Sequence, residues 1–123
     1  MNDAQRAQSI TVLGAGSWGT ALAIQLARAG QQVTLWGRAD DEPEKLAVER
    51  VNQRYLPDIA FPDGLSVDGD LARAVGGRRD VLVVVPSHAL RPMLNAVKPL
   101  LETDARIAWA TKGFEQDTGK LPH

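Results

Sequence analysis

The sequence has 123 residues, so one domain over residues 1–123 is predicted, and its 44% hydrophobic and 24% charged residues are typical of a soluble globular protein. A net charge of −1 argues against nucleic acid as a partner, and the lack of cysteine excludes disulfides and thiolate metal sites, so no metal is expected. The sequence contains neither an apolar run of membrane-spanning length nor a signal-peptide core, so we expect a cytoplasmic protein with no membrane span.

Strands and helices alternate along the sequence. In chain order the pattern predicts a strand at 9–13, a helix at 17–29, a strand at 32–36, a helix at 40–51, an irregular loop at 55–64, a strand at 65–67, a helix at 70–75, a strand at 80–85, a helix at 87–101 and a strand at 106–110. This alternation predicts an α/β fold of the Rossmann type, a doubly wound parallel sheet in three layers with strand order 3-2-1-4-5. The sequence stops soon after the last predicted strand, so we expect a fragment of a longer protein.

The first strand leads directly into a glycine motif. Gly14, Gly16 and Gly19 form the pattern G-x-G-x-x-G, followed by an apolar helical pattern. In such a motif the first glycine makes a tight turn, the second lets a pyrophosphate approach the backbone, and the third lets the helix pack closely. The motif predicts dinucleotide binding; the alternative is a purely structural strand-to-helix turn. Trp18, inside the motif, either packs under the cofactor or fills the interface between helix and sheet.

The end of the second predicted strand bears on the choice of cofactor. Dinucleotide-binding folds that prefer NAD carry an acid about 20 residues past the motif, whereas an arginine there accommodates the 2′-phosphate of NADP. Here Gly37 and Arg38 follow the strand, so NADP is favoured and NAD stays an option. Two alternatives remain: Arg38 is only a surface residue, or Asp40 or Asp41 folds back toward the strand end.

Other candidate residues follow the fourth and fifth predicted strands, at the carboxyl edge where ligands bind in such folds. Ser87 is expected to cap the next helix or contact a ligand, and His88 is either a surface residue or an acid–base group. Lys112 is either a surface lysine or a group that binds a phosphate or polarises a carbonyl. Arg78 and Arg79 precede the fourth strand at the opposite edge and are expected to be solvated.

Several segments together resemble one family, the bacterial NAD(P)-dependent glycerol-3-phosphate dehydrogenases. The matching segments are residues 14–23, residues 33–38, Asn52 with Tyr55-Leu56-Pro57, residues 84–87 and Trp109-Ala110-Thr111-Lys112-Gly113. They occur in the family's order and cover nearly the whole chain. The Ala-Thr-Lys-Gly and Tyr-Leu-Pro segments are far more specific than the glycine motif.

The resemblance implies interconversion of dihydroxyacetone phosphate and glycerol 3-phosphate, for phospholipid synthesis. It implies a cofactor site at Ser17, Trp18, Arg38 and Tyr55, beside Gly14, Gly16 and Gly19. Lys112 then serves both cofactor and substrate and is the catalytic candidate. The family often has a second basic residue after the arginine, where this chain has Ala39, which leaves the 2′-phosphate to Arg38.

The family also has a second, helical domain that supplies a further lysine as general acid–base and most substrate contacts. Without it, we expect a cofactor-binding half with negligible turnover of its own. A homodimer of the full-length enzyme is left open. The competing interpretations are another two-domain reductase, for hydroxyacids or ketopantoate, and a non-catalytic nucleotide-sensing module.

Overall fold

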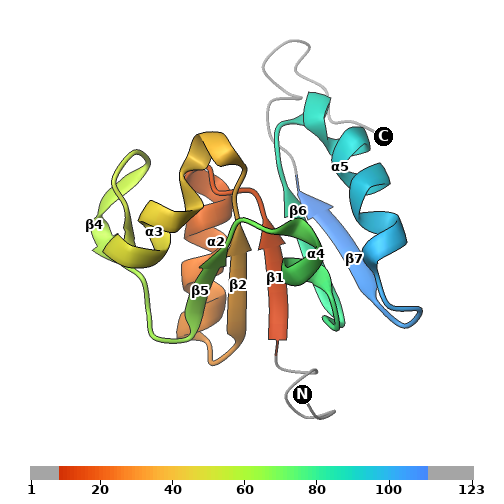
Figure 1. Ribbon diagram of the computed structural model, residues 1–123. Helices are drawn as coiled ribbons and strands as arrows, with labels where there is room; N and C mark the ends of the chain where they lie inside the picture. Colours follow the sequence, from red (N-terminus) through yellow and green to blue (C-terminus); the bar gives the residue numbers. More distant parts are fainter. Residues whose placement is uncertain (1–8, 111–123) are drawn as a thin grey trace, which may run out of the picture.

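The central sheet has five parallel strands whose carboxyl ends share one edge, the upper edge in Figure 1. The computed structural model describes residues 9–110. In spatial order the strands are β5 (Leu65–Asp68), β2 (Gln32–Trp36), β1 (Ser9–Leu13), β6 (Asp80–Val84) and β7 (Arg106–Ala110). This is the predicted order 3-2-1-4-5, so the predicted doubly wound α/β fold is confirmed.

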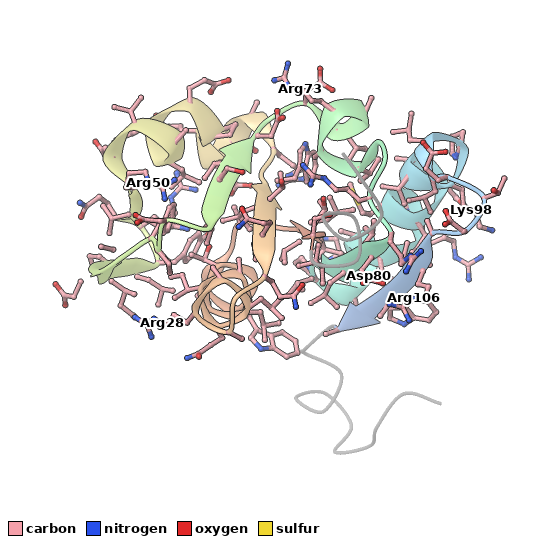
Figure 2. The ribbon with its side chains drawn as sticks, turned by 90° about the horizontal axis from the view of Figure 1, so that it is seen from below. Arg28, Arg50, Arg73, Asp80, Lys98 and Arg106 are labelled. Atoms are coloured by element: carbon pink, nitrogen blue, oxygen red, sulfur yellow. The ribbon has the colours of Figure 1, made fainter. Side chains whose placement is uncertain are left out.

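Helices cover both faces of the sheet and make three layers (Figures 1 and 2). Helix α2 (Ser17–Arg28) lies on one face, and α4 (Leu71–Val75) and α5 (Ser87–Val97) lie on the other. Helix α3 (Pro43–Glu49) packs against β5 at the edge of the sheet. Two short 3₁₀ turns, η1 (Ala39–Asp41) and η2 (Lys98–Leu100), connect these elements. Within residues 9–110, no helix has the length and apolar character needed to cross a membrane.

The three inner strands β1, β2 and β6 are mostly buried, as their apolar runs predict for a parallel sheet covered on both faces. Val12 belongs to the core under α2 and Leu13 to the core under α4 and α5, and both are fully buried. Burying a side chain of this kind contributes about 1.5–3 kcal/mol, so successive residues of one strand stabilise both layers. Thr11, also fully buried, donates its hydroxyl hydrogen bond to the Ala74 carbonyl of α4.

Two predictions for residues 40–64 are wrong. The predicted helix at 40–51 is divided into η1 and α3, because Glu42 takes a left-handed conformation with φ of 53° directly before Pro43, and a residue before proline disfavours the helical region. The predicted loop at 55–64 contains a strand, β4 (Leu56–Ala60), which pairs antiparallel with β3 (Val51–Asn52) in a separate ribbon. Proline is tolerated in such a ribbon because its missing N–H can face away from the partner strand.

Smaller differences concern the ends of helices and one arginine. Helix α5 ends at Val97, and residues 98–100 continue as η2 because Pro99 lacks the N–H that a longer helix needs. Ser87 is the first residue of α5 and not its cap, because Pro86 occupies the cap position and makes no side-chain bond. Arg78 is partly buried and donates to the Thr34 hydroxyl at 3.1 Å, so its predicted solvation is wrong.

Candidate functional site

The glycine turn after β1 lies between the ends of β2 and β6. Gly14 has φ of +125°, which side chains rarely allow, and a Cβ built on it would overlap the Val84 carbonyl oxygen. Its N–H donates to the Trp36 carbonyl at 2.9 Å. Glycine is therefore required here both by the backbone angle and by the close approach of β6.

The other two glycines of the motif differ from each other in what surrounds them. A Cβ on Gly19 would overlap the Gly14 carbonyl oxygen, so this glycine lets α2 pack directly on the turn. A Cβ on Gly16 would meet nothing within 4 Å, and Gly16 has an ordinary φ of −77°. Neither the packing of the fold nor the backbone angle therefore requires glycine at position 16. The space in front of Gly16 is open at this point of the turn.

That open space lies at the N-terminus of α2, where Gly16 is the capping residue. No side chain caps the helix, and its first turn contains no acidic residue. The first N–H groups of a helix have no partner within the helix, and its dipole favours anions at this end by roughly 0.3–1 kcal/mol. A phosphate group therefore fits the space in front of Gly16.

A cavity of about 350 Å³ opens in front of the glycine turn. It is bounded by the turn, by the ends of β2 and β6, by the start of α5 and by the β3–β4 ribbon. Its lining includes Gly14, Gly16, Trp36, Arg38, Asp41, Tyr55, Pro86 and His88. Four of the residues predicted for the cofactor site, from three separate parts of the chain, therefore surround one cavity.

The remaining predicted site residues lie around this cavity or outside the described residues. Ser17 begins α2, and Trp18 packs partly buried against the core, while its contact with the cofactor stays a prediction. His88 lines the cavity as an exposed side chain of the first turn of α5. Lys112 lies outside the described residues; β7 ends at Ala110, opposite Val84 of β6 and at the edge that carries the cavity.

Asn52 links the β3–β4 ribbon to the glycine turn, and the sequence interpretation gave it no role. Its side chain is only 3% exposed. Its amide Nδ2 donates to the Ala15 carbonyl at 3.1 Å and to the Thr20 hydroxyl at 2.9 Å. One buried amide thus holds the middle of the turn and the first part of α2 in place. In the sequence, Asn52 stood out only as part of a segment that resembles the family, and no local pattern indicated this structural role.

Arg38 and Asp41 both lie just after the end of β2. Asp41 folds back in η1, and its Oδ2 accepts a hydrogen bond from the Arg38 backbone N–H at 2.9 Å. The Arg38 guanidinium is 69% exposed and lies 3.9 Å from the carboxylate of Asp40, which is 83% exposed. Of the two acids that the sequence left open, Asp41 is the one that folds back onto the strand end and lines the cavity.

The comparisons with known proteins identify the family. Residues 9–123 match the model described as the NAD-dependent glycerol-3-phosphate dehydrogenase N-terminus. The chain belongs to this family. The resemblance stated from the sequence is thereby confirmed.

Similar bacterial proteins are named as glycerol-3-phosphate dehydrogenases. The chain is 61% identical over 113 residues to a glycerol-3-phosphate dehydrogenase [NAD(P)+] from Pseudoalteromonas translucida, covering 92% of this chain and 34% of the relative. It is 58% identical over 113 residues to the enzyme of that name from Serratia proteamaculans, covering 92% of this chain and 33% of the relative. The chain therefore spans about a third of the length of these curated relatives.

Solved structures of the dehydrogenase share the fold. The glycerol-3-phosphate dehydrogenase of Coxiella burnetii superposes with a TM-score of 0.81 at 48% identity, covering 86% of this chain and 33% of that one. The enzyme of Saccharomyces cerevisiae gives a TM-score of 0.74 at 27% identity, covering 87% of this chain and 34% of that one.

Proposed function

We propose that this chain is the cofactor-binding part of an NAD(P)-dependent glycerol-3-phosphate dehydrogenase. The full-length enzyme interconverts dihydroxyacetone phosphate and glycerol 3-phosphate for glycerophospholipid synthesis. The observation that carries the proposal is the open space at Gly16, in front of the uncapped N-terminus of α2 and inside a cavity at the carboxyl edge of the sheet. This arrangement suits the pyrophosphate of a dinucleotide, and the family model supports it.

Each end of the cavity suits one half of a dinucleotide. Gly16 and the first N–H groups of α2 bind the pyrophosphate, Arg38 binds the adenosine 2′-phosphate, and Tyr55 contacts the adenosine end. Pro86 and the first turn of α5 form the opposite wall of the cavity. When bound, the nicotinamide supplies or takes up the hydride, while the protein provides position and electrostatics.

Lys112 is proposed to complete the site on the substrate side. It follows β7 by two residues in the sequence, and β7 ends at the edge of the sheet that carries the cavity. There its ammonium group holds the anionic substrate and stabilises charge on the carbonyl oxygen during reduction. The proton donor and most substrate contacts are proposed to lie in the part of the relatives' length that this chain does not span.

Two measurements test the proposal. Titration of the 123-residue chain with NADPH and with NADH, followed by nucleotide fluorescence, is expected to show saturable binding of both, and binding of neither would contradict the cofactor assignment. In the full-length enzyme, Lys112→Ala is expected to lower the rate of NADPH oxidation with dihydroxyacetone phosphate while the protein stays folded. Unchanged kinetics would show that Lys112 is not part of the site. Robust turnover by the 123-residue chain alone would contradict the proposal that the proton donor and most substrate contacts lie outside this chain.

A further inference from the structure

The end of β2 carries an acid that the linear sequence does not place there. Asp41 and Arg38 are joined by two hydrogen bonds: the Arg38 N–H donates to Asp41 Oδ2, and the Asp41 N–H donates to the Arg38 carbonyl, each at 2.9 Å. This closed turn fixes the direction of the Asp41 side chain. Its carboxylate therefore has a defined position beside the first residues after β2.

Gly37 provides the space for this arrangement. A Cβ on Gly37 would lie 3.0 Å from the Asp41 Cβ, 3.2 Å from its Oδ2 and 3.1 Å from the Ala15 Cβ. Gly37 thus lies between Asp41 and Ala15 of the glycine turn, and Asp41 packs against the end of β2. It lines the main cavity with Arg38, and it also lines a second cavity of about 300 Å³ that reaches along α3.

The two side chains have opposite preferences for the adenosine ribose. An acid at this place in dinucleotide-binding folds accepts a hydrogen bond from the ribose 2′-OH, whereas an arginine accommodates the 2′-phosphate. An ionised carboxylate has about four acceptor positions, and the bond from the Arg38 N–H uses one of them. A phosphate monoester carries about −1.5 to −2 charges at neutral pH, so Asp41 repels it where Arg38 attracts it.

We propose that Asp41 is a specificity-determining residue that opposes Arg38, accepts the ribose hydroxyl of NADH and keeps the site open to both dinucleotides. The inference rests on the proposed function, because it assumes that the cavity holds the adenosine end of the cofactor. It gives Asp41 a role that neither the glycine motif nor Arg38 predicts. Asp40, one residue earlier and nearly fully exposed, has no such role.

The test compares two substitutions that remove the same charge. Asp41→Asn keeps the shape and an oxygen that accepts from the Arg38 N–H, and Asp40→Asn is the matched control. We expect Asp41→Asn to shift the ratio of Kd for NADH to Kd for NADPH about tenfold in favour of NADPH, measured by fluorescence titration at low salt. The shift should shrink at high salt because it comes from charge repulsion. Asp40→Asn is expected to change the ratio less than about twofold, in keeping with a loose surface pair.

A third variant and the wild type separate the ways in which the inference can fail. Asp41→Glu keeps the charge and is expected to keep the ratio within about threefold of wild type, which rules out a general disturbance of the turn. An unchanged ratio in Asp41→Asn, or an equal shift in Asp40→Asn, would overturn the inference and leave the proposed function standing. If the wild type bound neither dinucleotide, the proposed function itself would fail.

Discussion

The link between Asn52 and the glycine turn allows a prediction of stability. Asn52→Ala removes two hydrogen bonds, to the Ala15 carbonyl and the Thr20 hydroxyl, from a side chain that is 3% exposed. A hydrogen bond of this kind contributes about 1 kcal/mol, and a buried acceptor left without its partner adds about 1–3 kcal/mol. The free energy of unfolding is therefore expected to fall by about 3–5 kcal/mol.

Urea unfolding followed by circular dichroism measures this loss. Thr20→Val removes one of the two acceptors with little change of shape, so the double variant gives the coupling between Asn52 and Thr20, expected at about 0.5–1.5 kcal/mol. Gln53→Ala is the matched control, because this neighbour on the same ribbon is exposed, and its effect should stay within about 0.5 kcal/mol. A loss below about 0.5 kcal/mol in Asn52→Ala would show that the ribbon does not support the turn.

Three further predictions concern other contacts. Gly19→Ala is expected to lower the free energy of unfolding by at least about 2 kcal/mol, because the added Cβ would overlap the Gly14 carbonyl oxygen. A loss under about 0.5 kcal/mol in urea unfolding would contradict the close packing of α2 on the turn. Arg50 (Figure 2) has φ of 58° and donates hydrogen bonds to two backbone carbonyls at 2.6 and 2.8 Å. Both Arg50→Ala and Arg50→Gly remove these bonds, but glycine also relieves the left-handed backbone, so in the same assay Arg50→Ala should be destabilising by about 1 kcal/mol more than Arg50→Gly. Equal losses would refute this. The hydrogen bond from Arg73 lowers the pKa of Asp68, so the stability gained from this pair is present above the ordinary carboxyl pKa of 3.8 and is lost as the pH falls through the lower, folded value. Arg73→Ala should raise that pKa in an NMR titration, and an unmoved value would contradict the cause.

The main sheet could be predicted from the sequence because local composition determines it. The run of valines and leucine at 81–84 is apolar at every position, and it forms most of β6, an inner strand that packs into the cores on both faces of the sheet. The glycine motif was informative for the same reason, since the needs of Gly14 and Gly19 arise from contacts within or near the turn. Parallel strands separated by helices then leave few topologies.

The β3–β4 ribbon, which the sequence did not predict, depends on distant contacts. The β3–β4 ribbon is held to the turn through Asn52, whose partners lie 32 and 37 residues away in the sequence. The return of Asp41 depends on a closed turn followed by a left-handed residue at Glu42, which residue preferences do not favour. Both features shape the candidate site. The sequence predicted the outline of the site, gave no role to Asn52, and left open which of Asp40 and Asp41 folds back.

The most direct test of the account is the response to Gly16→Ala. The open space around this residue and its φ of −77° accommodate alanine, so the free energy of unfolding should stay within about 0.5 kcal/mol of wild type or rise slightly. The added methyl group occupies the place proposed for the pyrophosphate, so the affinity for NADPH should fall at least about tenfold in a fluorescence titration, a loss of about 1.4 kcal/mol. A stable Gly16→Ala variant that binds NADPH as tightly as wild type would contradict the central claim that the glycine turn binds the dinucleotide.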